Sequence, residues 1–475
     1  MPGVRRGQSA AADIARVATK ELRERLRDRW FVLAIAVMAL LGVAAALSGA
    51  AAADTRARIN AAAQAGDYAR WLAQPVRDAH SASHFGTSAF FVPSRLSSLD
   101  PGVVPYVGAS LFLEAHKQNE PVFAEAPDGG AVQRLGRISL ATVIQVWLPL
   151  IVIATAAGAF AAEREAGTLA LLLSIGVSPA RLMAGKALAA VAVVLAVAGP
   201  GVAVGAGLLG RVGGAWPADL LERSALLAAA WGLYLVFWVA ITLAVSLRAP
   251  NVRLAMAALL TVWCLSVVVT PRVAADLARV AHPLPSRAEL YRLEIERRIQ
   301  TPGSYEKLRQ QILVDYGAKT PADLPIDINV IYAQRAEARI NQRIDERTAE
   351  LWAIYHGERR DYQRASVLSP AVALDLASMA AAGSDDVHHR DFLKQAEDYR
   401  RQMMAVLGEA ERRKPGAKRT RGDAELWRRL PPFQYQVPGV WRVETAAGQA
   451  LTALAAWCVA GLVAAFVALR AVVAR

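Results

Sequence analysis

The chain has 475 residues, of which 55% are hydrophobic, and a mean hydropathy of +0.27. A soluble chain of this length normally divides into about two or three domains with mixed surfaces. Here the apolar residues are concentrated in uncharged blocks, which excludes an ordinary soluble protein. The net charge of +13 does not indicate nucleic-acid binding, because the basic residues alternate with Asp and Glu, as in "EIERRIQ", in the manner of solvated helix faces.

The first predicted element is an amphipathic helix over residues 12–29, within an N-terminal arm 1–29. Apolar side chains recur at helical spacing while Lys and Arg fill the other faces; the apolar positions are Ile14, Val17, Ala18, Leu22 and Leu26. A helix of this kind lies in the plane of a membrane, with its apolar side toward the acyl chains. The alternative is a plain cytoplasmic extension of the helix that follows.

Six uncharged apolar blocks come next, each long enough to cross a membrane as a helix, which takes about 20 residues. They are 30–53, 141–162, 187–210, 224–247, 254–271 and 446–469. A charge at mid-span costs about 2.5–3.5 kcal/mol, so charge-free blocks of this length predict six transmembrane helices. The first block exceeds the apolar core of a signal peptide, about 7–15 residues, which favours an uncleaved span over a cleaved leader. Cys264 and Cys458 lie inside predicted spans and therefore provide neither a disulfide framework nor a zinc site.

Short basic segments set the predicted orientation. Lys and Arg occur in the arm, in residues 163–186, in loop 248–253 and at the C-terminus, and six spans place all four on one side. The positive-inside rule makes that side cytoplasmic, with both termini inside a bacterial inner membrane. Two long segments, 54–140 and 272–445, then lie outside. The predicted fold is an all-α polytopic membrane protein with six transmembrane helices, an N-terminal in-plane helix and two extracytoplasmic insertions, the second mostly α-helical.

The sequence assigns no catalytic or cofactor-binding residue. The six blocks contain no Asp, Glu or His, the residues that serve as relays in ion-driven transporters. Gly185-Lys186 is the only Gly-Lys pair, but Ala187 follows it and Ala180 stands where the first P-loop glycine would be. If the protein works actively, another chain must hydrolyse ATP.

Two histidine pairs are candidate metal ligands. His80 and His84 are spaced i, i+4, and His388-His389 lie beside Asp385. Seven histidines are spread over the whole chain, so turn and surface roles explain both pairs equally well, and no metal ligand is assigned.

The segment "EREAGTLALLLSIGVSPARLMAGK", residues 163–186, joins the second and third spans and is more elaborate than a connector requires. Two acids continue a helix past the apolar block, Gly167 allows a close backbone approach, and Ser178-Pro179 is a helix start. Leu169, Leu172 and Leu173 are expected to form an exposed apolar patch, which is unfavourable unless a partner covers it. The segment therefore predicts a rigid helix–turn–helix knob for a partner; the alternative is a tight hairpin that packs on its own bundle.

This segment resembles the cytoplasmic loop of ABC-2-type exporter permeases, the membrane subunits driven by a separate ATPase. The positions that carry the resemblance are Glu163, Arg164, Glu165, Gly167, Thr168, Leu169, Leu172, Leu173, Ser178 and Gly185-Lys186. The resemblance implies that the loop holds a coupling helix that docks on the ATPase, and that the in-plane helix is the family's connecting helix. The stretches "ASHFGTSAFFVPSRLSSLDPGVVPYVG" and "LSPAVALDLASMAAAGSDDVHH" are similar to a sub-branch with large extracytoplasmic insertions and a domain of unknown function.

The resulting prediction is a permease subunit of an ATP-driven transporter, most simply an exporter, that is not itself an enzyme. It carries no cofactor of its own, while ATP and Mg²⁺ bind the partner. The expected partners are an ATP-binding cassette ATPase on the cytoplasmic face, a second permease copy and the lipid membrane, with no nucleic acid. Two other classes fit the same features. One is a mechanotransmission or signalling protein that moves no substrate, and the other is a periplasmic metal-binding module on a membrane anchor.

Overall fold

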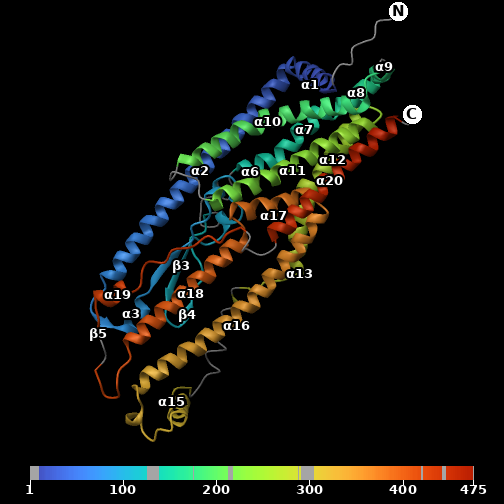
Figure 1. Ribbon diagram of the computed structural model, residues 1–475. Helices are drawn as coiled ribbons and strands as arrows, with labels where there is room; N and C mark the ends of the chain where they lie inside the picture. The colour runs from blue at the N-terminus through green and yellow to red at the C-terminus, as the bar shows by residue number, and fades with distance from the viewer. Residues whose placement is uncertain are drawn as a thin grey trace, which may run out of the picture.

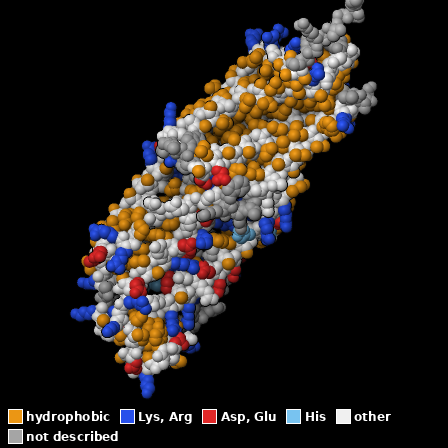
Figure 2. Space-filling view, viewed as in Figure 1, with side chains coloured by type: hydrophobic (Ala, Val, Ile, Leu, Met, Phe, Trp, Pro, Cys, Tyr) orange, Lys and Arg blue, Asp and Glu red, His pale blue; other side chains and the backbone are white. Residues whose placement is uncertain are grey.

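The computed structural model describes residues 10–125, 138–174, 176–211, 218–286, 288–289, 292, 304–418, 421–440 and 446–473. The molecule is elongated, with a bundle of apolar helices at one end and a long, mostly helical extension at the other (Figure 1). We call the end of the bundle that carries α1 (Ala10–Leu26) and α9 (Thr168–Ser174) the proximal end, and the extension beyond the opposite end of the bundle the distal region. A broad apolar belt covers the bundle, whereas charged side chains gather beyond it in the distal region (Figure 2).

Six helices in the described residues are long and apolar enough to cross a membrane, which confirms the predicted fold class. They are α2 (Arg29–Leu72), the composite helix Leu140–Glu165, α10 (Pro179–Arg211), α11 (Ala218–Arg248), the composite helix Val252–Ala281 and α20 (Ala446–Val473). The helix α2 continues nearly twenty residues beyond the predicted end of its span at residue 53, because Ala-rich and charged helix formers, with no proline among them, follow the apolar block.

The N-terminal helix α1 is separate from the first span. The Asp28 carboxylate caps α2 by accepting hydrogen bonds from the backbone N–H groups of Trp30 (2.9 Å) and Phe31 (3.4 Å). This cap starts a new helix at Arg29, and α1 lies across the proximal end of the bundle (Figure 1). The plain extension of the first span is thereby excluded.

Each composite span contains one π-helical turn. The second span consists of α6 (Leu140–Thr142), the π turn Val143–Trp147, α7 (Leu148–Ala156) and α8 (Gly158–Glu165). The fifth span consists of α12 (Val252–Trp263), the π turn Cys264–Val269 and α13 (Thr270–Ala281).

A π turn displaces backbone carbonyls from the regular helical ladder, and those carbonyls need other donors. Tyr234 Oη donates to the Gln145 carbonyl oxygen (2.7 Å), and Ser369 Oγ donates to that of Ser266 (2.5 Å). The distal-end halves of both spans are thus fixed to neighbouring helices.

Helix α17 (Pro370–Ala382) inserts into the distal end of the bundle. It packs between α11 and α20, and its Ala371, Leu374 and Ala381 belong to the same buried core as the spans. Trp231 Nε1 donates to Ser378 Oγ (3.2 Å), which fixes α17 to α11. The sequence placed this stretch in an external insertion, but thirteen mostly small apolar residues form a helix that plugs the bundle instead.

The larger core of the distal region is built from both long insertions. Trp71 at the end of α2, Phe91, Phe392, Met403 and Trp427 share it. Around this core lie α3 (Ala79–Phe85), α18 (Asp386–Ala410), α19 (Ala424–Arg428), the antiparallel pair β1 (Arg77–Asp78) and β5 (Arg421–Gly422), and the antiparallel sheet β2 (Thr87–Phe90), β3 (Ser110–Glu114) and β4 (Lys117–Gln118). A separate arm is formed by α16 (Ile328–Arg364), which packs against α13, and by α15 (Ser304–Asp315).

Candidate functional site

Two left-handed glycines shape the turn at the proximal end. Helix α8 ends at Glu165, Gly167 (φ +73°) reverses the chain, and α9 follows from Thr168 to Ser174. Gly176 (φ +85°) then reverses it again, and Ser178 accepts the first hydrogen bond of α10 on its carbonyl oxygen, from Leu182 N (3.0 Å). Left-handed glycines end helices without the steric cost that a Cβ would add, so the turn is short and defined.

The leucines of α9 are arranged differently from the predicted exposed patch. Leu169 is buried, and Leu172 and Leu173 are half-buried against the bundle core. Leu171 is the exposed one, with 60% of its surface accessible. The prediction of exposure for Leu169, Leu172 and Leu173 was wrong because these side chains share the helix face that packs on the bundle, while Leu171 points away from it.

A buried charge cluster ties the turn to α1. Lys186 in α10 is 1% exposed, and its Nζ donates to Glu21 Oε1 (2.5 Å) and to Glu163 Oε1 (2.9 Å). Lys20 approaches the same Glu163 carboxylate at 3.7 Å. The cluster therefore joins three elements, α1, α8 and α10. Glu21 was not predicted as a site residue, although on a helical projection of α1 it falls on the apolar face between Val17 and Ile14, which is the signal that could have identified it.

Close packing and a second ion pair hold α1 on α10. A Cβ built on Gly185 would lie 2.5 Å from Val17 Cβ and 2.9 Å from the Ile14 carbonyl oxygen, so only glycine fits there. Arg181 Nη1 and Asp13 Oδ2 form an ion pair at 2.8 Å. Helix α1 is thus seated on the first turns of α10.

The other two charged residues of the turn reach the loop between α11 and α12. Arg164 donates to the carbonyl oxygens of Ala249 (2.7 Å) and Leu247 (2.5 Å), which satisfies the C-terminal end of α11. The backbone N–H of Val252, at the start of α12, donates to Glu165 Oε2 (3.4 Å). Glu163, Arg164 and Glu165, together with Lys186, therefore connect α8 to α1, α10, α11 and the start of α12.

A cavity of about 620 Å³ lies at the opposite end of the bundle, where the spans meet α17 and the distal region. Asp100 and Asp375 both line it. Ser378 Oγ donates to Asp100, and Tyr362 Oη donates to Asp375 Oδ2 (3.2 Å). Burial and then the negative charge of Asp100 raise the pKa of Asp375 to about 7. Asp375 faces the cavity and is half-buried, so water reaches part of its surface although protein surrounds it.

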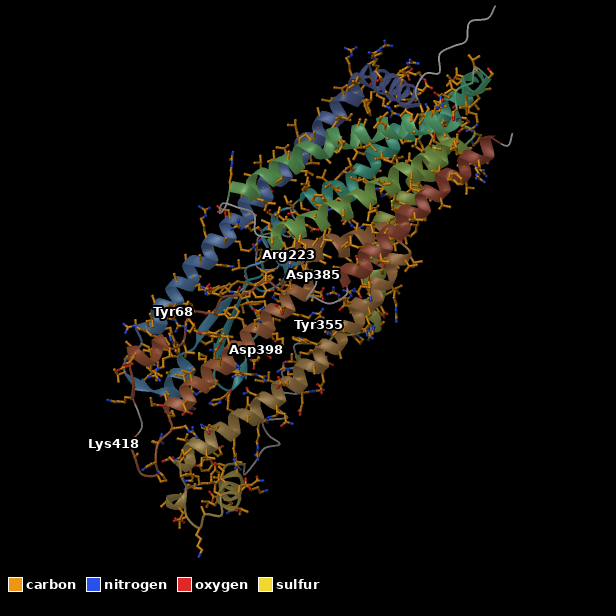
Figure 3. All side chains as sticks on the ribbon, in the orientation of Figure 1. Tyr68, Arg223, Tyr355, Asp385, Asp398 and Lys418 are labelled. Carbon is orange, nitrogen blue, oxygen red and sulfur yellow. The ribbon has the colours of Figure 1, made fainter. Side chains whose placement is uncertain are left out.

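Arg223 closes the junction between α17 and the distal region. It is fully buried, its Nε donates to Asp219 Oδ2 (2.9 Å), and its Nη1 donates to the carbonyl oxygens of Ala380 and Ala381 (both 3.4 Å) at the end of α17. A cation at a helix C-terminus is favourable, because the last carbonyls of a helix are not fully satisfied within it. Figure 3 places Arg223 near Asp385, which is joined to it through His388.

The candidate histidines fall in two different environments. Both His388 and His389 are buried, with His388 Nδ1 on Asp385 (2.5 Å) and His389 Nε2 on the Gly108 carbonyl oxygen (3.1 Å). These contacts are structural.

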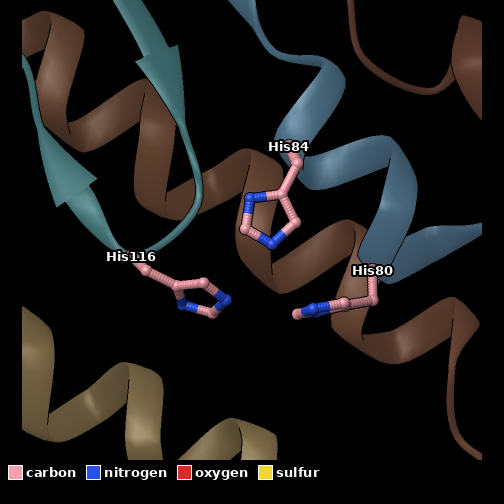
Figure 4. A group of neighbouring side chains, drawn as sticks. All are labelled: His80, His84 and His116. Atoms are coloured by element: carbon pink, nitrogen blue, oxygen red, sulfur yellow. The ribbon is translucent and has the colours of Figure 1, made fainter.

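By contrast, His80 and His84 meet a third histidine, His116 (Figure 4). In the described residues this is the one group of three candidate metal ligands whose ligand atoms all lie within 4.8 Å of one another. Burial and the neighbouring His80 and His116 rings lower the pKa of His84. His116 was missed because it is 32 positions from His84 in the sequence, on a turn with no spacing signal.

Comparison with known families matches two models along the chain. Residues 15–320 match the model of a family described as ABC-2 family transporter protein, and residues 299–436 match a domain of unknown function, DUF3526. The first match covers well over half of the chain, from α1 into α15. The two matches together confirm the resemblance drawn from the 163–186 segment and the long insertions. No curated protein matches the chain.

Proposed function

The chain belongs to the ABC-2 family of transporters, and we propose that it is a permease subunit whose α8–α9 turn receives the motion of a separate ATPase and passes it to the spans. The observation that carries this proposal is the Lys186 cluster. A displacement of α9 is passed directly to the adjoining α8. Buried ion pairs of Lys186 with Glu163 and Glu21 then connect α8 to α10 and α1. Arg164 and Glu165 extend the same connection to α11 and α12.

ATP and Mg²⁺ are assigned to the partner. The only Gly-Lys pair of the chain lies inside α10, where Gly185 packs on α1 and the Lys186 ammonium is occupied by two carboxylates. A phosphate-binding lysine needs a free ammonium at a loop of backbone N–H groups. This chain therefore transmits force, and the ATP-binding cassette subunit performs the hydrolysis.

The proposed orientation puts the proximal end in the cytoplasm of a bacterium, with the distal region beyond the inner membrane. Support comes from the basic residues of α1 and from Arg470 near the end of α20, which gather at that end. An excess of Lys and Arg marks the cytoplasmic side of short loops. ABC permeases act in pairs, so a second copy or a second permease completes the pathway, most simply for export.

The exposed Leu171 offers a direct test of docking. A Leu171→Glu variant puts a charge on the outer face of α9 without disturbing the buried face, and it is expected to lower co-purification of the ATPase and stimulated hydrolysis at least tenfold. Val314→Glu, at an even more exposed position in the distal α15, is the matched control. Unchanged assembly and hydrolysis in Leu171→Glu would assign the turn a purely structural role.

A second candidate function is mechanotransmission without transport, in which ATPase work reshapes the distal region. It is favoured by α2, which runs without a break from the proximal end into the distal core. ATP-dependent accumulation of a substrate in sealed vesicles would exclude this alternative.

A further inference from the structure

Three imidazole rings face a common space in the distal region. His80 and His84 come from α3, and His116 comes from the turn between β3 and β4 (Figure 4). The ring centroids form a nearly equilateral triangle, with separations of 4.8, 5.1 and 5.4 Å. One ligand atom from each ring lies within 4.8 Å of the others.

The backbone fixes these three positions relative to one another. The i, i+4 spacing puts His80 and His84 on one face of α3, which Asp78 caps through its hydrogen bond from Ser81 N (3.0 Å). The turn that carries His116 is joined to the same helix, because Ala115 N donates to the Ser83 carbonyl oxygen (3.0 Å). The convergence of the rings is therefore built into the local fold.

The backbone conformation of His116 is uncommon for a residue other than glycine. The β3–β4 hairpin turns through Ala115 and His116, and His116 has φ +66°, in the left-handed region that favours glycine. Any side chain other than glycine costs stability there, and such strained positions concentrate at functional sites. His116 therefore occupies a position where glycine would cost less conformational free energy.

A half-buried carboxylate orients the His116 ring. Glu337 Oε2 lies 2.8 Å from His116 Nδ1, and Arg400 Nη1 holds the other carboxylate oxygen at 2.8 Å. A carboxylate on one ring nitrogen fixes the tautomer and leaves the other nitrogen as the metal ligand, an arrangement that recurs behind metal-bound histidines. The second carboxylate of the neighbourhood, Glu411, accepts a hydrogen bond from His80 N (3.3 Å).

We propose that His80, His84 and His116 bind one divalent late first-row transition-metal ion, Zn²⁺ or Cu²⁺, through three imidazole nitrogens. Imidazole ligands suit these ions, whereas Mg²⁺ and Ca²⁺ need oxygen ligands. A tetrahedral ion with Zn–N bonds of about 2.0–2.1 Å sets its ligand atoms about 3.4 Å apart. The exposed His80 and His84 have room for the small rotations that would close the site.

The fourth coordination position is left to water or to an exchangeable ligand. A hollow of about 280 Å³ beside His80 and His116, also lined by Glu337 and Glu411, gives access to it. The ion would clamp α3 to the β3–β4 turn and, through Glu337, to α16. This metal site is independent of ATPase docking at the proximal end.

The test uses the full-length protein with any affinity tag removed, stripped with a chelator and then titrated with Zn²⁺ or with Co²⁺ as a visible probe. We expect one ion per chain, a rise in melting temperature, and a Co²⁺ absorption spectrum of a four-coordinate nitrogen site. His116→Gly should reduce affinity at least 100-fold while its metal-free melting temperature stays equal or rises, because glycine relieves the positive φ.

Matched variants decide between this site and adventitious binding. His84→Asn should behave like His116→Gly, whereas His356→Asn, which removes a histidine outside the cluster, should keep full affinity. Glu337→Gln should retain the ion with at least tenfold lower affinity. Substoichiometric metal in the wild-type protein, or equal binding by wild-type and His116→Gly, would overturn the proposal.

Discussion

Lys186 is the residue on which the proximal end depends most. Its ammonium is almost completely removed from solvent, and the two carboxylates around it come from helices that are far apart in the sequence. Burying a charge is costly, and removing one partner from a buried pair leaves the others uncompensated. The cluster is thus better at fixing the relative positions of α1, α8 and α10 than at adding net stability.

Replacing Lys186 with Met tests this view. The variant removes the buried cation between Glu21 and Glu163 and leaves only the exposed Lys20 near both carboxylates, and we expect the free energy of unfolding to fall by about 3 kcal/mol. The melting temperature of the purified protein measures the loss. A triple variant that adds Glu21→Gln and Glu163→Gln should recover part of it, because both carboxylates are then neutral, although Arg25 loses its ion pair with Glu21. A single variant as stable as the wild type would contradict the structural role of the cluster.

Asp375 predicts a dependence of stability on pH. Burial and the Asp100 charge raise its pKa to about 7 in the folded protein, against about 4 in an unfolded chain. Below a pH of about 4 the Asp375 carboxyl is protonated in both the folded and the unfolded chain, so its full contribution to folding stability is present. Between about 4 and 7 the unfolded chain releases the proton while the folded protein keeps it, so stability falls as pH rises.

The measurement is the melting temperature from pH 4 to pH 8 for the wild type and for Asp375→Asn. The variant should lose most of the decline over this window, since its amide does not titrate. An identical decline in both proteins would mean that Asp375 is already ionised in the folded state.

Single residues also mark the limit of what the sequence reveals. Glu163 and Lys186 are predictable as members of the turn because they flank apolar blocks. The partners of Glu21, Asp100 and His116 are not predictable, because each residue acquires its partner through packing of segments that lie far apart along the chain. Such long-range contacts leave no pattern of residue spacing in the local sequence.

At the scale of elements, the spans are predictable and α17 is not. An uncharged apolar helix of about 20 residues indicates a transmembrane span, because its length matches the hydrocarbon core of a membrane. A mostly apolar helix of thirteen residues, by contrast, fits a soluble core, an interface or a plug equally well. What places α17 in the bundle is the set of donors around it, including Trp231 and Ser369, together with the buried cation of Arg223 at its C-terminal end. These are properties of the assembled fold.

The seating of α1 on α10 predicts a sharp difference between two glycines of one helix. Gly185→Ala forces a Cβ against Val17 and is expected to cost about 1–3 kcal/mol. Gly207→Ala adds a Cβ with nothing within 4 Å and should be neutral or stabilising by up to about 1 kcal/mol, since Ala is the better helix former. Limited trypsin digestion at the arginines of α1 reports its displacement. Equal digestion of the two variants would show that α1 is not held at Gly185.

At the scale of the whole molecule, α2 is the longest continuous connection between the two ends. Its 44 residues span about 66 Å, roughly twice the thickness of a hydrocarbon core. Its distal half is fixed to the distal core, since Asn60 Nδ2 donates to the Phe91 carbonyl oxygen and Trp71 Nε1 to that of Trp427, both at 3.0 Å. Because α2 is one continuous helix fixed to the distal core, we expect a tilt of the first span to displace the distal region as well.

Interrupting α2 should abolish ATP-dependent motion of the distal region while the ATPase still assembles with the protein. Two glycines inserted after Thr55 break the helix between span and distal core, because glycine is a poor helix former. Spin labels at the exposed positions Ile59 of α2 and Leu277 of α13, introduced as Ile59→Cys and Leu277→Cys with Cys264 and Cys458 replaced by Ala, report the distance between the first and fifth spans beyond the bundle. We expect the ATP-dependent change in this distance to disappear, while ATPase co-purification is retained.

The same insertion after Gly416, in an exposed turn of the distal region, should leave the change intact. If the distance still responds to ATP when α2 is interrupted, the motion travels through α13 and α16 instead, and the continuity of α2 has no mechanical role.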